Sequence, residues 1–361
     1  MINQGVNDYL NELILDKKRF LKGLAISLVV GITVILLIVF ITTNQNTWTS
    51  LSYISKKYLF FAFFLMVLAA AIDALRIKMT VEAVNEKISF FEALKVYYIS
   101  NFAGGITPFF SGTLPAQIYL FNKNIKNKMT IGKATMVASI MPLIKTLVFS
   151  IFTPVIFFGF KKTMIDYNIL SAILINGAIL VSLFFFFLFI LAVKCPDKML
   201  GIIFKIQHLP CILKFSKKEQ ISRLLDIIIL EIEEFHKSFS LLKENWIKIS
   251  LSTLYTIIFW STFFLIAPLL LKGFNLNFNL FHVLATQVIF YFILPFMPTP
   301  GASGTAEVGF ASLFSFFVPL HLLGLFVGAW RLIVFYFNLC IGATILLLEI
   351  KKLKKRKRNV K

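Results

Sequence analysis

The motif Thr-Pro-x-x-Ser-Gly-Thr occurs twice in this chain, and both copies interrupt long apolar stretches. The first copy spans 107–113 and the second spans 299–305, with five identical residues at identical spacing. A lipid bilayer cannot hydrogen-bond a broken helix backbone, so such a loop needs a cover of protein or a wet cavity. Two matched broken segments, one in each half, are typical of a transporter's substrate site; the alternative is a chance match in an apolar chain.

The apolar stretches themselves predict an all-α, polytopic integral membrane helical bundle. The 361 residues are 58% hydrophobic, against roughly 45–50% in a soluble domain. Runs near the length of a bilayer-spanning helix recur along the whole chain. They predict full spans at 24–42, 58–75, 134–160, 168–193, 247–271 and 331–349. Shorter apolar segments flank the repeated motifs and predict two re-entrant hairpins, which pair 90–105 with 113–122 and 281–297 with 304–320.

The distribution of positive charge predicts the orientation of these spans. With both termini in the cytoplasm, 30 of the 37 Lys and Arg residues fall on cytoplasmic segments of a cell-membrane protein. Three full spans then separate the two hairpins, so the hairpins enter from opposite sides. We therefore expect one transmembrane domain over 1–361, built as a pseudo-inverted repeat of 24–160 and 168–349. The amphipathic stretch 217–245 between the halves fits a helix on the cytoplasmic face or a plain connector.

Several functional classes find no support in the composition. Three cysteines without a C-x-x-C pair and four scattered histidines predict no disulfide framework and no metal site. No Ser, His and Asp set suggests catalytic residues for a soluble substrate, and no cofactor is expected. The net charge of +20 is read as the positive-inside signal with attraction to anionic lipid, not as a nucleic-acid surface.

The loops offer hydroxyl groups, close backbone approach at glycine, and helix N-termini suited to phosphate or carboxylate. Ser111 and Ser303 are also expected to cap the helices that follow, which does not exclude ligand contact. The candidate substrate-binding residues of the loops are Thr107, Pro108, Ser111, Gly112, Thr113 and Gln117 in the first half, and Thr299, Pro300, Gly301, Ser303, Gly304 and Thr305 in the second.

Three ionisable residues complete the candidate site. Lys145 lies near the middle of its span, where a charge is expensive and needs a cavity or a partner. Glu307 lies in the first turn after the second motif, where it binds a ligand or completes the helix cap. Arg331 opens the last predicted span, as a functional group or an interfacial anchor. Asp73 and Arg76 are read as a boundary pair at the cytoplasmic end of the second span.

The segment 296–307, with Leu323-Gly324 and Ala329-Trp330-Arg331-Leu332, resembles the signature of the lysylphosphatidylglycerol synthase/flippase membrane-domain family. The segment 101–112 resembles that family's first-half motif. The chain departs from the pattern at one position, because Ala302 follows Gly301 where the family usually has a second glycine. The resemblance covers essentially the whole chain.

The resemblance implies a protein that handles membrane lipids: an aminoacylated or anionic phospholipid in bacteria, or a polyprenyl phosphate in archaea. Longer members carry a C-terminal transferase domain, which is not expected in this chain. We therefore expect a lipid translocase and no enzyme. The alternatives are a polyprenyl-phosphate or glycolipid transporter, and lysyl transfer to phosphatidylglycerol. The sequence leaves the oligomeric state open, a homodimer included.

Overall fold

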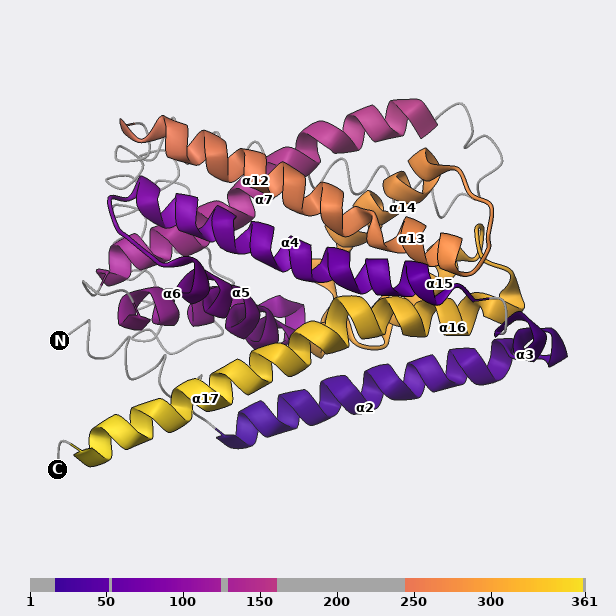
Figure 1. Ribbon diagram of the computed structural model, residues 1–361, viewed down its shortest axis with the longest axis horizontal. Coiled ribbons are helices and arrows are strands. Elements are labelled where there is room, and N and C mark those ends of the chain that lie inside the picture. Colours follow the sequence, from indigo (N-terminus) through magenta and orange to yellow (C-terminus); the bar gives the residue numbers. More distant parts are fainter. Residues whose placement is uncertain (1–16, 52–53, 125–128, 161–243, 360–361) are drawn as a thin grey trace, which may run out of the picture.

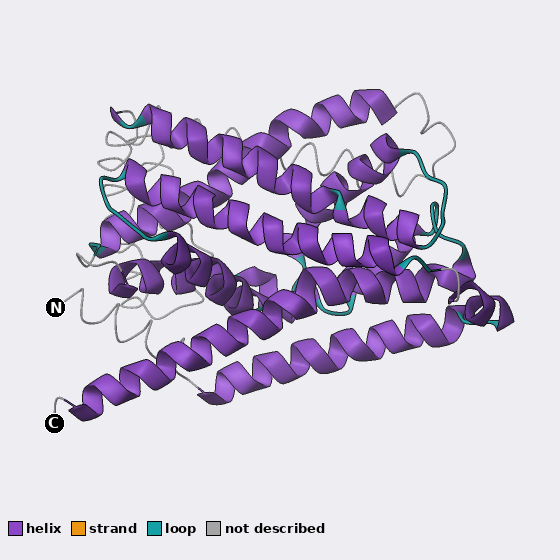
Figure 2. Cartoon of the chain, in the orientation of Figure 1, coloured by secondary structure: helices purple, strands orange, loops and turns teal. Residues whose placement is uncertain are grey.

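The computed structural model describes residues 17–51, 54–124, 129–160 and 244–359. Every regular element in these ranges is helical, and none of them contains a strand (Figure 2). Five helical segments of the described chain are long and apolar enough to cross a membrane: Lys22–Thr42, Lys56–Ala83, Ile131–Phe149, Trp246–Gly273 and Leu320–Lys352. The all-α, multi-pass prediction is confirmed. The predicted span 168–193 and nearly all of the segment 217–245 lie outside the described residues.

Two antiparallel segments form the central layer of the described bundle. Helix α4 (Lys56–Ala83) packs along α12 (Trp246–Phe264) and α13 (Ile266–Gly273), as Figure 1 shows. At one end, Ser55 N donates to Gly273 O at 2.8 Å; at the other, Asn245 Nδ2 donates to Ala83 O at 3.1 Å. Buried alanines on α4 let the two backbones approach closely, as small residues do between membrane helices.

The two segments end in the same type of turn. Because the segments are antiparallel, the helices that follow them start at opposite ends of the bundle. Asn85 and Asn275 follow α4 and α13 with φ of 60° and 56°, a left-handed conformation that asparagine tolerates at a helix C-terminus. Helix α5 (Phe90–Gly105) starts after the first turn, and α14 (Leu280–Ile293) starts after the second. Each has a side-chain cap on its first turn, from Ser89 and Asn279.

The first hairpin is α5, the short 3-10 turn η1 (Pro108–Phe110) and α6 (Thr113–Asn124). Its two ends lie together, because Lys133 near the start of α7 (Ile131–Phe160) pairs with Glu86 in the α4–α5 turn, with Nζ 2.6 Å from Oε1. The chain thus leaves one end of the bundle at α5 and is back at that end when α7 begins.

The second hairpin is α14, two 3-10 turns, η3 (Leu294–Phe296) and η4 (Pro300–Ala302), and α15 (Thr305–Phe314). It returns to the opposite end of the bundle, where α16 (Leu320–Arg331) begins. Phe326 of α16 lies against Phe274 at the end of α13, with ring centroids 5.8 Å apart. The two hairpins therefore point toward each other from opposite ends of the antiparallel pair.

The last span is longer than the sequence predicted. Helix α16 continues through a π-helical turn, η5 (Leu332–Tyr336), into α17 (Phe337–Asn359), and the three form one long, bent helix in Figure 1. The prediction that a span starts at Arg331 is wrong, because the apolar segment before this residue joins the helix. Helix α2 (Lys17–Thr42) runs beside α16, and the short α3 (Gln45–Leu51) follows it.

Candidate functional site

The first four residues of the two repeated motifs adopt the same backbone conformation. Phe109 has φ 57° and ψ 18°, and the equivalent Gly301 has φ 59° and ψ 22°. The next residues, Phe110 and Ala302, have φ of 54° and 53°. Three of these four residues are not glycine, and left-handed backbone is unfavourable for them, so the surrounding structure must hold it. The sequence repeat is thus a structural repeat over its first four residues. The loops differ at the fifth residue, where Ser111 has a ψ of −24° and Ser303 has a ψ of 137°.

The two loops are hydrogen-bonded to each other. Phe109 N donates to Met297 O at 3.2 Å, and Gly301 N donates to Thr107 O at a longer 3.4 Å. A Cβ at Gly301 would lie 2.5 Å from Gly105 O, so only glycine permits this approach. Two segments almost 200 positions apart in the sequence therefore form one junction, which we call the loop junction (107–113 with 297–305).

The first loop is closed by its own threonine. Thr107 Oγ1 donates to Ala103 O at 2.9 Å and accepts from Gly112 N at 2.8 Å. Pro108 and Ser111 are exposed, whereas Gly112 is buried. Of the polar side chains in the first loop, Ser111 is thus the exposed one, while Thr107 is engaged within the loop.

Gln117 and Thr113 lie on α6, beyond the first loop. Gln117 is buried within the first hairpin, where its Nε2 lies 3.5 Å from Ser100 Oγ, at the limit of a hydrogen bond. Thr113 is half-buried and faces Gly104 of α5. Both predicted residues therefore contribute to the interior of the first hairpin.

The second loop surrounds a buried ion pair. Arg331 Nε lies 2.7 Å from Glu307 Oε1, and the two side chains are 2% and 0% exposed. Arg331 Nη2 also donates to Gly301 O at 2.7 Å, and Glu307 Oε2 accepts from Gly304 N at 2.6 Å. The carboxylate thus binds the free N–H at the start of α15 and the guanidinium together. The predicted capping role of Glu307 is confirmed.

Ser303 does not cap α15, contrary to the prediction. Gly304 occupies that position with φ 87°, and the Glu307 carboxylate supplies the cap. Ser303 is buried, and its Oγ lies 3.1 Å from Ser27 Oγ on α2. Thr299 and Thr305 close the loop instead, with their Oγ1 atoms 3.4 Å apart.

Helix α2 covers the loop junction, which the sequence did not predict. A Cβ at Gly31 would lie 2.6 Å from the Tyr336 hydroxyl and 3.1 Å from Glu307 Oε1. Gly23, Ser27 and Gly31 recur at four-residue spacing, so they share one face of α2. This small-residue spacing, which allows close helix contact, is the signal that could have identified α2 as part of the site.

Arg331 is an interior residue and not an interfacial anchor. It is the last residue of α16 before the π-helical turn, and its guanidinium carbon lies 3.9 Å from the centroid of the Phe335 ring. Single π-helical turns inside α-helices are frequent at functional sites. The sequence analysis named Arg331 as a candidate but did not predict its interior location, because it placed the start of the last span at this residue.

Lys145 lies in a different place from the loop junction, on α7. Its side chain is half-buried, and its Nζ lies 4.6 Å from the centroid of the Trp260 ring and 5.4 Å from that of Phe149. Asp73 and Arg76 are not a boundary pair, because α4 continues past them to Ala83. Asp73 is buried, and Arg76 is half-buried. Asp73 Oδ1 lies 2.9 Å from Arg76 Nη2.

No metal-binding group of three or more His, Cys, Asp or Glu side chains occurs in the described part of the chain. The chemistry available at the loop junction is therefore hydrogen bonding and charge pairing by hydroxyls, backbone amides, one guanidinium and one carboxylate. Such a set can bind a charged group of either sign.

The fold defines an all-α, multi-pass membrane protein with two opposed hairpins. The chain belongs to the family described as the lysylphosphatidylglycerol synthase TM region, whose model matches residues 24–342. It is similar to a "UPF0104 membrane protein" of Archaeoglobus fulgidus, with 27% identity over 321 residues, which cover 88% of this chain and 94% of the relative. No solved structure shows a significant match.

Proposed function

We propose that this protein is a lipid translocase, which moves a phospholipid with a polar headgroup between the leaflets of a cell membrane. The observation that carries the proposal is the loop junction, where two like loops approach from opposite ends of an antiparallel helix pair. Transporters with inverted repeats place their substrate site where broken helices meet, so that one site can open to either side in turn. The family membership supports a lipid as the cargo.

The proposal includes the membrane topology. The hairpins are re-entrant, the regions 24–160 and 168–349 are the inverted halves, and both termini lie in the cytoplasm, in line with the charge distribution. Backbone that is not helical at membrane depth survives when protein covers it. The mutual hydrogen bonds of the loops and the α2 contact at Ser303 provide this cover.

The Arg331–Glu307 pair gives the site a way to bind a headgroup that carries both charges. A lipid phosphate takes the place of Glu307 at Arg331, and a lysyl ammonium binds the released carboxylate. Each new contact replaces one of equal type, so neither buried charge is left alone during the exchange. Lysylphosphatidylglycerol and related aminoacylated phospholipids have this combination of groups.

The test measures lipid movement by the purified full chain in liposomes. Lysylphosphatidylglycerol is placed in one leaflet, and its appearance in the other is followed with an amine reagent that does not cross the membrane. We expect Glu307→Gln and Lys145→Ala to abolish movement, and Lys57→Ala, at an exposed lysine, to leave it unchanged. Size-exclusion profiles confirm that each variant is folded.

Wild-type rates in both Glu307→Gln and Lys145→Ala refute the proposal. A mild effect of Glu307→Gln with a full loss in Lys145→Ala identifies a purely anionic cargo, such as a polyprenyl phosphate, because only a cationic headgroup needs the carboxylate. The aminoacyl group would then have no role in recognition.

A further inference from the structure

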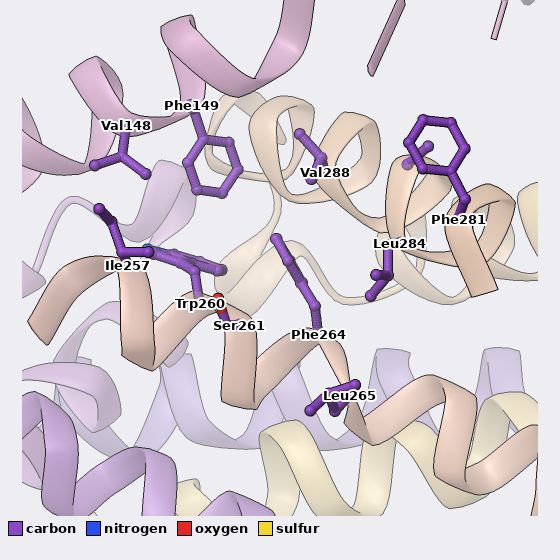
Figure 3. A pocket seen from close by; sticks show the side chains of 11 residues that line it. Val148, Phe149, Ile257, Trp260, Ser261, Phe264, Leu265, Phe281, Leu284 and Val288 are labelled. Carbon is purple, nitrogen blue, oxygen red and sulfur yellow. The ribbon is translucent and has the colours of Figure 1, made fainter. Parts of the chain in front are cut away.

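A cavity of about 320 Å³ lies between α7, α12 and α14, apart from the loop junction. Its walls are mostly apolar side chains, with Ser261 also in the lining. Phe149, Phe264 and Val288 converge on the same space from the three helices (Figure 3). This volume lies at the lower end of ligand cavities, roughly 300–1,000 Å³. An apolar cavity among membrane helices fits a hydrocarbon chain.

Lys145 stands beside this cavity. The two rings nearest its ammonium, Phe149 and Trp260, are also lining residues of the cavity. No carboxylate among the described residues pairs with Lys145, although Glu82, Glu86 and Glu349 all pair with other lysines. A half-buried cation on a membrane helix without an acidic partner has its charge available for a ligand.

The indole N–H of Trp260 is a second polar group beside the cavity. Trp260 Nε1 is buried and has no hydrogen-bond partner in the described part of the chain. Buried indole N–H groups normally find an acceptor, so this donor requires one. Lys145 and Trp260 therefore offer two donors on neighbouring side chains, and Trp260 Nε1 has no acceptor among the described residues.

The charged groups near Lys145 do not neutralise its positive charge. Asp73 already pairs with Arg76, and the guanidinium of Arg76 lies 6.0 Å from the ring of Phe259, the neighbour of Trp260. Arg76 and Lys145 are close enough to repel each other. The three side chains carry a net charge of one positive unit, which attracts an anion.

We propose that the cavity, Lys145 and Trp260 form a binding site for one anionic phospholipid, separate from the loop junction. The phosphate accepts hydrogen bonds from Lys145 Nζ and Trp260 Nε1, and one acyl chain fills the cavity. The inference rests on the proposed function in that this site holds a lipid before it reaches the loops.

The experiment measures quenching of Trp260 fluorescence by lipids brominated on their acyl chains. The full chain is reconstituted in phosphatidylcholine vesicles with rising fractions of brominated phosphatidylglycerol or, for comparison, brominated phosphatidylcholine. The difference between wild type and Trp260→Phe isolates the signal of Trp260. Trp246, which is exposed at the start of α12, provides the control for general attraction of anionic lipid, through Trp246→Phe.

We expect Trp260 to be half-quenched at about a tenfold lower fraction of the anionic lipid, the factor for one charge-assisted hydrogen bond. Lys145→Gln removes this preference, and Lys145→Arg keeps it. Val288→Phe fills the cavity and lowers quenching by both lipids. Equal quenching of wild-type Trp260 by the two lipids, a preference no larger than that of Trp246, or an unchanged preference in Lys145→Gln overturns the proposal.

Failure of this proposal can be distinguished from failure of the translocase proposal. Absence of the preference in the wild-type chain, together with normal lipid movement, rejects this site and leaves the translocase in place. A wild-type preference of Trp260 without any lipid movement supports the site and rejects the translocase.

Discussion

Glu307→Gln tests whether the Arg331–Glu307 pair holds the loop junction together. The substitution keeps the shape of the side chain, and the glutamine oxygen can still accept from Gly304 N. It removes the charge opposite Arg331, whose side chain is 2% exposed. Breaking a buried ion pair from one side costs about 3–5 kcal/mol, because the other charge is left buried and alone. Since Arg331 keeps its bond to Gly301 O, we expect about 3 kcal/mol.

The assay is reversible unfolding of the purified chain in mixed micelles, with denaturing detergent as the variable and far-UV circular dichroism as the signal. A double-mutant cycle with Arg331→Met measures the coupling of the two side chains. Replacing both charges removes the unpaired partner, so the double variant should lose about 2 kcal/mol less than the two single losses combined. The matched control is Glu349→Gln, which breaks the more exposed pair with Lys95 and should cost less than about 1 kcal/mol.

A coupling below about 0.5 kcal/mol contradicts the reasoning, since this is the range expected of independent sites. Equal losses in Glu307→Gln and Glu349→Gln contradict it as well, because the argument depends on burial and not on ion pairing as such.

Two further predictions concern the packing around the pair. Gly301→Ala places a Cβ 2.5 Å from Gly105 O, at a backbone φ of 59°, so we expect lipid movement to fall at least tenfold. An active variant in the liposome assay would show that the loops need not touch. Phe310 stacks on Trp330 with ring centroids 3.8 Å apart, so Phe310→Ala opens a cavity there. We expect it to lower the free energy of unfolding in mixed micelles by about 3–5 kcal/mol, and a loss under about 1 kcal/mol would be inconsistent with this packing.

Local sequence patterns predicted the helices of the first hairpin, because these patterns act on the backbone of the residues that carry them. The repeated Thr-Pro-x-x-Ser-Gly-Thr breaks a helix wherever it occurs, and α5 and α6 accordingly lie within three residues of their predicted bounds. The apolar runs likewise predicted α4 and α7. The end of α4 was placed too early because Asp73 and Arg76 look like a membrane boundary in one dimension, whereas in three dimensions α12 and α7 pack against α4 and Asp73 is buried.

Arg331 illustrates the same limit at the candidate site. A charge after an apolar segment indicates a span boundary when neighbours along the chain are the only guide. Its partner, Glu307, is 24 positions away, and only the fold of the second hairpin against α16 brings the two within 2.7 Å. A desolvated charge is tolerated inside the bundle once it is paired, and no pattern in the sequence reports that pairing.

The sequence by itself determined that the chain is a helical membrane protein, that two like loops interrupt its helices, and which residue types those loops contain. These properties follow from hydrophobicity and backbone preference, which act over a few neighbouring residues. Only the tertiary structure decided that the loops form hydrogen bonds with each other and that α2 covers them through Ser27 and Gly31. It also decided that Lys145 lies beside a separate cavity. Those facts depend on side chains far apart in the chain, because packing and charge pairing act through space.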